Sequence, residues 1–152
     1  MTTRATQQLE TSEEAVRQAN AEFYQAFAAL DLERMDAVWA HEDWVECVHP
    51  GWDLLLGWED VRASWAQIFA STERVRVEVS SVLVRVEADT AWVSCREHVM
   101  SAFAKGFTQA HLLATNIFVR RELPAEAGGG ARWLLATHHS SPLPPGRPAS
   151  LQ

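Results

Sequence analysis

The fold of this chain is decided by residues 61–86, VRASWAQIFASTERVRVEVSSVLVRV, where the spacing of the apolar residues changes. Up to Phe69 they recur at intervals of three and four residues, which is the spacing of one helix face. From Val75 onward every second residue is apolar over much of the stretch, as in a half-exposed strand. The stretch therefore predicts a helix over residues 59–71 and then a long strand over residues 75–86.

Two further helices and a pair of short strands are predicted on the N-terminal side. Thr11 and Glu14 have the spacing of a capping box in front of a run with helical periodicity. Asp31 is a favourable N-cap for a second, shorter helix. Short strands are predicted over residues 44–48 and 54–56, on either side of a turn signal.

On the C-terminal side the pattern predicts strands over residues 91–103, 107–122 and 132–140, joined by short links. Consecutive strands joined in this way pair antiparallel, and helices that precede a sheet pack on one of its faces. We therefore predict an α+β fold with a strongly bent antiparallel sheet. The domain is expected to span residues 12–142, between a flexible tail (residues 1–11) and a proline-rich tail (residues 143–152).

The composition limits the possible partners. With 152 residues, 47% of them hydrophobic and 22% charged, the chain can bury the core of one globular domain. The formal net charge is -7 and Arg120-Arg121 is the only tight basic pair, so a polyanion would be repelled. We expect no nucleic-acid partner.

The cysteines and the apolar runs favour a cytoplasmic protein. Cys47 and Cys95 are the only cysteines, and both stand in apolar strand-like stretches, where a buried free thiol is the common state. Residues 1–14 lack the apolar segment of a signal peptide, and no apolar run approaches the roughly 20 residues needed to span a bilayer. We therefore expect no contact with a membrane.

Four groups of residues between residues 12 and 142 carry a family resemblance. They are Phe23-Tyr24 with Asp31, then His49-Pro50-Gly51 with Gly57, Val61 and Trp65, then Thr115-Asn116-Ile117-Phe118, and finally Trp133 with His138-His139-Ser140-Ser141-Pro142. Together with the order of elements they resemble the nuclear transport factor 2-like superfamily, in particular its SnoaL-like and ketosteroid-isomerase-like branch. The resemblance implies a cone-shaped, strongly curved sheet packed against three N-terminal helices, a pocket for a small organic molecule, and a homodimer.

The resemblance also implies roles for single residues. In ketosteroid isomerases an aspartate base precedes a proline at the end of the first strand, and the matching residue here is His49. An acidic oxyanion donor lies on their penultimate strand, where this chain has Asn116, and a tyrosine lies on their first helix, where this chain has Phe23 with Tyr24 one place away. The base has thus changed type and an amide replaces the acid.

The last strand resembles a second branch, the association domain of calcium/calmodulin-dependent kinases, where a His-x-His pattern precedes a serine. This chain has Thr137 at the first of these histidine positions and keeps His139 and Ser141. That branch assembles proteins and catalyses no reaction. It implies an alternative function, a noncatalytic ligand-sensing or dimerisation module.

The residue types support acid–base chemistry. An imidazole has an unperturbed pKa of about 6.5, so His49 can take or give a proton near neutral pH, and the Asn116 amide can donate to a developing oxyanion. His138 and His139 point to opposite faces of their strand, and the kinase-domain likeness favours His139 for the pocket. Glu97 is expected to be exposed in its strand.

Aromatic residues are expected to line the pocket. The expected lining residues, beside His139, are Tyr24, Trp44, Trp52, Trp65 and Phe118, each of which also suits plain core packing. Such a lining predicts a small apolar or aromatic ligand. The leading hypothesis is an isomerase, dehydratase or cyclase that needs no cofactor, because enolisation requires only a base and hydrogen-bond donors. The histidine spacing predicts no metal site.

Overall fold

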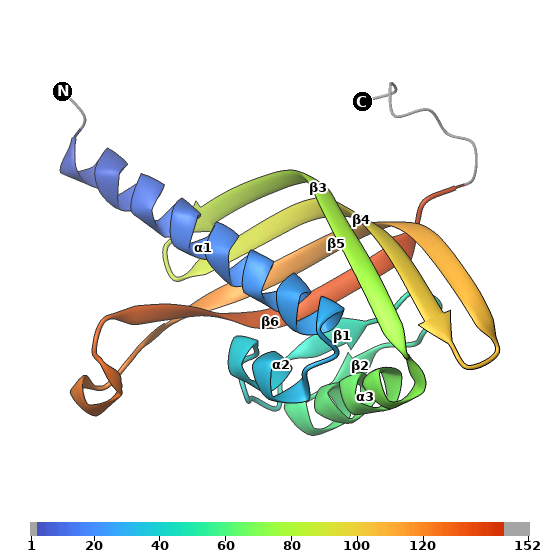
Figure 1. Cartoon of the computed structure of the whole chain (residues 1–152). Helices are drawn as coiled ribbons and strands as arrows, with labels where there is room; N and C mark the ends of the chain where they lie inside the picture. The colour runs from blue at the N-terminus through green and yellow to red at the C-terminus, as the bar shows by residue number, and fades with distance from the viewer. Residues whose placement is uncertain (1–2, 145–152) are drawn as a thin grey trace.

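Helices and strands follow one another in the predicted order in the computed structural model, which describes residues 3–144 (Figure 1). The helices are α1 (Arg4–Ala28), α2 (Leu32–Val38), α3 (Trp58–Ser71) and the short 3-10 helix η1 (Ala125–Ala127). The strands are β1 (Glu46–Val48), β2 (Leu55–Leu56), β3 (Arg74–Glu87), β4 (Thr90–Phe103), β5 (Gly106–Glu122) and β6 (Ala131–Pro142). The α+β class is confirmed. Most of the predicted proline-rich tail lies outside the described residues.

All six strands belong to one sheet, in the order β2-β1-β6-β5-β4-β3. Strands β3 to β6 form the predicted antiparallel meander, but β1 runs parallel to β6, so the sheet is mixed and the prediction of an antiparallel sheet is wrong at this edge. The reason is that no hairpin joins β1 to β6. Sequence-adjacent strands with short links must reverse, whereas strands far apart in the chain can pair in either direction.

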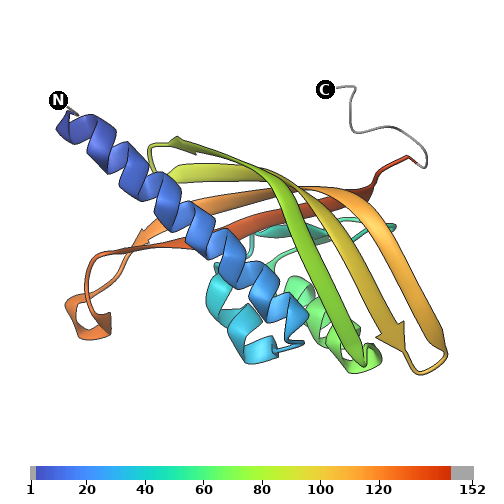
Figure 2. The ribbon, with the colours of Figure 1, turned by 45° about the horizontal axis from the view of Figure 1, so that its top comes forward.

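Two bulges interrupt the regular pairing of the long strands. One lies between Ser80 and Leu83 of β3, where Ser81 has a φ of 53°, and the other lies opposite the Ile117–Phe118 step of β5. A bulge bends a strand and increases its twist. The sheet therefore curves, and all three helices lie on its concave side (Figure 2).

Helix α1 begins earlier than predicted. It starts at Arg4 with Thr3 as N-cap, whose side chain accepts a hydrogen bond from the Thr6 N–H. Thr11, the predicted start, lies within the helix and donates its hydroxyl to the Gln7 carbonyl. Residues 4–10 contain mainly good helix formers, and their helical state replaces most of the predicted tail. This first part of α1 extends beyond the sheet (Figure 1).

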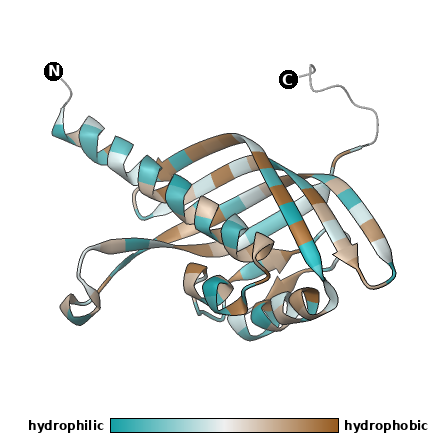
Figure 3. Ribbon diagram, viewed as in Figure 1, coloured by the Kyte–Doolittle hydropathy of each residue, from teal (hydrophilic) through white to brown (hydrophobic). Residues whose placement is uncertain are grey.

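The hydrophobic core lies between α1 and the concave side of the sheet. Phe23 at its centre is fully buried and packs edge-to-face on Tyr24, Trp65 and Trp39, with ring centroids 4.8, 5.7 and 6.5 Å away. Burying one such side chain stabilises the fold by about 1.5–3 kcal/mol. Along the long strands apolar and polar residues alternate (Figure 3). No helix in residues 3–144 is long and apolar enough to cross a membrane.

Candidate functional site

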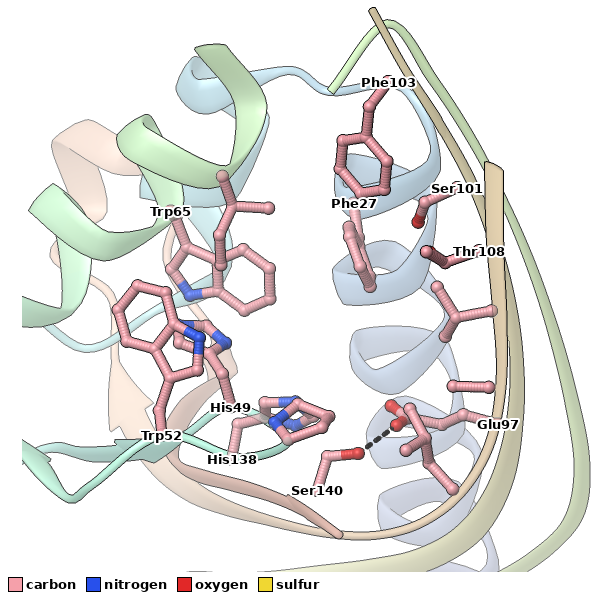
Figure 4. Close-up of a pocket in the computed structure, with 15 residues that line it drawn as sticks. Phe27, His49, Trp52, Trp65, Glu97, Ser101, Phe103, Thr108, His138 and Ser140 are labelled. Atoms are coloured by element: carbon pink, nitrogen blue, oxygen red, sulfur yellow. Dashed lines mark hydrogen bonds between the residues drawn. The ribbon is translucent and has the colours of Figure 1, made fainter. Parts of the chain in front are cut away.

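A cavity of about 260 Å³ lies between the concave side of the sheet, helix α3 and the end of α1 (Figure 4). Strand β4 contributes alternate residues to its wall, β5 and β6 contribute their inward residues, and the turn after β1 contributes the opposite side. The lining residues are Phe27, His49, Pro50, Trp52, Trp65, Ile68, Glu97, Val99, Ser101, Phe103, Thr108, Ala110, Leu112, His138 and Ser140. The hydrogen-bonding groups gather mostly at one end, where Glu97, Ser140, His138 and His49 lie (Figure 4).

Glu97 is the one carboxylic acid among the described residues of this wall. Its side chain points inward from β4 on the same face as Val93 and Cys95, and the residue is only 3% exposed. The Ser140 hydroxyl on β6 donates a hydrogen bond to its Oε1 atom. Burial raises the pKa of Glu97, while Ser140 and, to a smaller extent, the Tyr24 hydroxyl act in the opposite direction. The carboxyl pKa therefore moves from its usual range toward neutrality.

His49 lies on the opposite wall, at the end of β1. Its Nε2 atom lies 2.8 Å from the Ser64 Oγ, and Ser64 donates its own hydrogen to the Val61 carbonyl. Ser64 therefore accepts from His49, which places the imidazole hydrogen on Nε2. The ring also packs edge-to-face against Trp52 and Trp65, with centroids 4.9 and 4.7 Å away.

His138 reaches the cavity from the neighbouring strand β6. Its Nδ1 atom lies 2.6 Å from the Asn116 Oδ1, and the Asn116 Nδ2 donates to the Asn20 Oδ1 at 2.8 Å and to the Tyr24 hydroxyl at 3.1 Å. Because the amide nitrogen donates in both of these bonds, Oδ1 is the end that faces His138 and must accept. This network places the His138 hydrogen on Nδ1 and leaves Nε2 as an acceptor without a hydrogen-bond partner among residues 3–144.

Both cavity histidines are neutral imidazoles near pH 7. Burial lowers the pKa of His49 to about 3, with a smaller contribution from His138 nearby. Burial likewise lowers the pKa of His138 to about 3, with a smaller contribution from His139. A base whose conjugate acid is this strong accepts a proton poorly, so these rings act as hydrogen-bonding groups more readily than as proton carriers.

Asn116 does not serve as the predicted oxyanion donor. The residue is fully buried and is absent from the cavity wall, and both amide hydrogens are used within the protein. The reason is that α1 covers this part of β5 and brings Asn20 and Tyr24 onto the amide. Its effect on the cavity passes through His138, whose ring it orients.

The other predicted lining residues divide into two groups. Trp52 and Trp65 lie in the cavity wall. Tyr24 borders a second, more open hollow of about 350 Å³ between α1 and β3, and Phe118 is enclosed in the core. Trp44 precedes β1, is 44% exposed and packs its ring 5.7 Å from the Arg121 guanidinium carbon.

His139 is exposed and lies on the outer face of β6, contrary to the prediction that it lines the cavity, whereas His138 is buried. Trp133 and Leu135 point inward, as every second residue of a regular strand does. If this alternation continued without interruption, His139 would also point inward. The bulge opposite Ile117–Phe118 inserts Ala136, which is also buried, and so shifts the alternation by one residue. His138 and Ser140 point into the cavity as a result.

The described residues contain no cluster of three or more histidine, cysteine, aspartate or glutamate side chains suited to a metal ion. Cys47 and Cys95 are buried free thiols. Burial raises the pKa of Cys95 to about 11 and that of Cys47 further, so both remain protonated and neither is an activated nucleophile.

Comparison with known proteins identifies the family. The sequence profile of the SnoaL-like domain matches residues 16–145, which is most of the chain. The chain belongs to the SnoaL-like domain family. Its fold is that of the nuclear transport factor 2-like superfamily, which agrees with the resemblance drawn from the sequence.

Two solved structures are similar to this SnoaL-like domain in sequence as well as in fold. A candidate dehydratase of the nuclear transport factor 2-like family from Streptomyces avermitilis is 33% identical, with a TM-score of 0.77 over 89% of this chain and 98% of that chain. A candidate calcium/calmodulin-dependent protein kinase type II association domain from Thiobacillus denitrificans is 32% identical, with a TM-score of 0.69 over 83% of this chain and 93% of the other.

A plant relative places a similar domain in a longer protein. The F-box protein SKIP8 of Arabidopsis thaliana is 28% identical over 127 residues, which cover 84% of this chain and 49% of that protein. The SnoaL-like domain described here thus spans about half the length of the F-box protein.

Sequence reasoning missed Glu97, His138 and Ser140. Glu97 carried a readable signal, because Ala91, Val93, Cys95 and Glu97 alternate along β4 and the first three are apolar. A carboxylate is rarely buried, and this general expectation is the reason that the sequence predicts an exposed Glu97. His138 and Ser140 carried no such signal, since their orientation depends on the bulge at Ala136.

Proposed function

We propose that this SnoaL-like domain binds a small organic molecule in the cavity and catalyses an isomerisation, dehydration or cyclisation by acid–base chemistry. The observation that carries the proposal is the buried Glu97 carboxyl, which lines the cavity beside Ser140 and has a raised pKa. The similarity to a candidate dehydratase supports the same class of reaction.

Glu97 is a better proton carrier in this cavity than His49, the predicted base. A general acid or base works best when its pKa is near the operating pH. Burial moves the pKa of Glu97 toward neutrality but moves the pKa of His49 to about 3, away from it. We therefore assign proton transfer to Glu97, and hydrogen bonding to the ligand to His49 and His138.

The three reactions share one first step. The ionised Glu97 carboxylate takes a proton from the carbon beside a carbonyl group, and the C–H electron pair becomes the double bond of an enolate. The protonated Glu97 then returns the proton to another carbon (isomerisation), to a departing hydroxyl group (dehydration) or to the new alkoxide after the enolate attacks a second carbonyl (cyclisation). None of these steps calls for a cofactor.

Proton exchange tests this proposal without knowledge of the natural substrate. Small cyclic ketones incubated with the protein in D₂O should take up deuterium beside the carbonyl, which NMR detects directly. In Glu97→Gln the exchange rate should fall by about 100-fold or more, because general acid–base catalysis contributes a factor of that size. Glu78→Gln, at an exposed glutamate of β3, is the matched control and should leave the rate unchanged.

The alternative is a noncatalytic ligand-sensing or dimerisation module. The similarity to a candidate kinase association domain favours it, as does a similar domain within an F-box protein. Ketones that bind in the cavity without any exchange of their protons would favour this alternative over the enzyme.

We also propose that the domain is a cytoplasmic homodimer joined through the outer sheet face. Trp92, Leu113 and Phe107 point outward from β4 and β5 and are 39%, 45% and 65% exposed, so a second copy of the chain could bury their apolar surface. Analytical ultracentrifugation should give the dimer mass, and Leu113→Glu should give the monomer. A monomer mass at every concentration would contradict the dimer.

A further inference from the structure

A chain of hydrogen bonds runs behind the polar end of the cavity, from His138 to Tyr24. It begins at the His138 Nδ1–H, which donates to the Asn116 Oδ1 at 2.6 Å. The Asn116 Nδ2 in turn donates to the Tyr24 hydroxyl oxygen at 3.1 Å. All three residues are buried, so water does not compete for these bonds. The donors therefore point in one direction, from β6 through β5 toward helix α1.

The Tyr24 hydroxyl accepts a hydrogen from Asn116, and its own hydrogen remains available for another acceptor. Two acceptors lie near it on β4. The first is the Cys95 Sγ at 3.3 Å. The second is the Glu97 carboxyl, whose pKa is raised by burial and lowered by the Ser140 and Tyr24 hydroxyls. A thiol sulfur is a weak acceptor and an ionised carboxylate is a strong one, so an ionised Glu97 is the preferred acceptor of the Tyr24 hydrogen.

The titratable groups around Glu97 carry no opposite charge. They are Tyr24 on α1, Cys47 on β1, His49 in the turn after β1, Cys95 on β4 and His138 on β6. Burial raises the pKa of the tyrosine and of both cysteines and lowers that of both histidines to about 3, so each group is neutral near pH 7. The residues that line the cavity include no lysine or arginine. Among residues 3–144, hydroxyl hydrogen bonds therefore stabilise an ionised Glu97 in place of a cation.

We propose, on the basis of the function proposed above, that Tyr24 is a positioning residue that donates its hydroxyl hydrogen to the ionised Glu97 carboxylate. Through Asn116 it also couples the charge of Glu97 to the ring of His138. Hydrogen bonds in a chain polarise one another, so each acceptor in turn becomes more negative when Tyr24 donates to a carboxylate. The Nε2 atom of His138 is therefore a stronger acceptor while Glu97 is ionised and a weaker one after Glu97 has taken a proton. No proton moves along the chain.

Tyr24 is the only tyrosine in the sequence, which makes the coupling directly observable by NMR. Protein labelled with ¹³C at the tyrosine Cζ gives one signal, from Tyr24, and labelled glutamate carboxyl groups report the titration of Glu97. We expect the Tyr24 signal to move at the midpoint of the Glu97 titration and to stay constant over that range in Glu97→Gln. A Tyr24 signal that does not follow Glu97 in the unmodified protein would overturn the inference without any further variant.

Two changes at Tyr24 should move the Glu97 midpoint in opposite directions. Tyr24→Phe deletes the hydroxyl and should raise the midpoint by about one pH unit, because a hydrogen bond to the charged form is lost. Incorporation of 3-fluorotyrosine keeps the hydroxyl as a more acidic, stronger donor and should lower the midpoint. Thr115→Val deletes an exposed hydroxyl next to Asn116 and, as the matched control, should leave the midpoint unchanged. An unchanged or lowered midpoint in Tyr24→Phe would contradict the hydrogen bond to Glu97.

The other end of the chain is measured at His138. In protein with ¹⁵N-labelled histidine, the Nε2 signal of His138, assigned by its absence in His138→Gln, should move at the Glu97 midpoint. Tyr24→Phe interrupts the chain but leaves Glu97 and His138 in the cavity wall, so an effect of the charge across the cavity would persist. We expect the His138 signal to move much less in Tyr24→Phe than in the unmodified protein. Equal movement in both would overturn the coupling through Asn116.

The proton-exchange assay separates this inference from the proposed function. In Tyr24→Phe the pH profile of the exchange rate should shift upward by the same interval as the Glu97 midpoint, because the rate follows the ionised carboxylate. A lower rate with an unshifted profile would show a merely structural role and overturn the inference alone. Absence of exchange, with Glu97, Tyr24 and His138 still titrating together, would overturn the proposed function and leave the hydrogen-bond chain in place.

Discussion

The two faces of strands β4 to β6 place the same residue types in opposite environments. Glu97 and His138 on the concave face are 3% exposed and line a cavity, whereas their chain neighbours His98 and His139 face outward. On the outer face His98 stacks on His111, with ring centroids 4.2 Å apart, and lies 3.5 Å from the exposed Glu78. The environment that turns a carboxyl group into a candidate catalytic group is thus set by the face of the strand.

This contrast supplies a matched control for each variant. Adjacent residues on a strand share their backbone surroundings and sequence position but point to opposite faces. A substitution on the concave face should therefore change stability or ligand binding, while the same kind of substitution one residue away should change little. The predictions below run from the largest expected effect to the smallest.

Asn116→Leu should destabilise the protein most. It removes the partner of Asn20, Tyr24 and His138 and leaves their polar atoms buried, at about 1–3 kcal/mol for each unpaired group. We expect a loss of about 3–5 kcal/mol in the free energy of unfolding, measured by urea denaturation. Thr115→Val on the exposed face should change it by less than about 0.5 kcal/mol. A similar loss in both variants would contradict the difference between the faces.

Acid should destabilise the protein through the two cavity histidines. Their pKa is about 3 in the folded state and about 6.5 in the unfolded state. Between these values the unfolded chain binds more protons, so the free energy of unfolding decreases as the pH is lowered. The raised pKa of Glu97 acts in the opposite direction. The stabilisation that comes from its protonated, buried carboxyl group is fully present below the unfolded-state pKa of 4.5 and is lost as the pH rises through the higher folded-state pKa. We expect a net loss of about 2–4 kcal/mol between pH 7 and pH 4.

Thermal or urea unfolding at several pH values checks this expectation. His138→Gln should reduce the slope by up to ~1.4 kcal/mol per pH unit in the range where only the unfolded histidine is protonated. His139→Gln, on the outer face, should keep the slope of the unmodified protein. An unchanged slope in His138→Gln would show that this ring is not held neutral by burial.

The smallest effect concerns ligand affinity. His138→Asn removes the Nε2 acceptor from the cavity and should weaken binding of a hydroxyl-bearing cyclic ketone by about tenfold, which is the value of one well-placed hydrogen bond. His139→Asn should leave the affinity within about twofold. Calorimetric titration of both variants measures the difference, and a loss in His138→Asn no larger than that in His139→Asn would contradict the placement of His138 in the ligand site.

Much of the fold could be predicted because it depends on local periodicity. The change of spacing between Phe69 and Val75 marks the helix-to-strand transition that the structure has between Ser71 and Arg74. The N-cap at Asp31 is also confirmed, since its side chain accepts a hydrogen bond from the Arg34 N–H. These signals involve residues a few positions apart, which the sequence displays directly.

The cavity was harder to predict because it depends on contacts between distant segments. His138 faces inward because of the bulge at Ala136, and the sequence of β6 contains no pattern that predicts this bulge. The amide of Asn116 is occupied by Asn20, which is 96 residues away in the chain. Of the three cavity residues that the sequence analysis missed, only Glu97 could have been placed correctly, from the alternation along β4.

The most direct test of the central claim is the ionisation of Glu97, measured by NMR on protein with ¹³C-labelled glutamate carboxyl groups. The Glu97 signal is assigned by its absence in Glu97→Gln. We predict that it titrates above the ordinary value of 4.5, and that its midpoint shifts when a small cyclic ketone is added as the ligand. A midpoint at or below 4.5 that does not respond to the ligand would contradict the assignment of Glu97 as the proton-transfer group of the cavity.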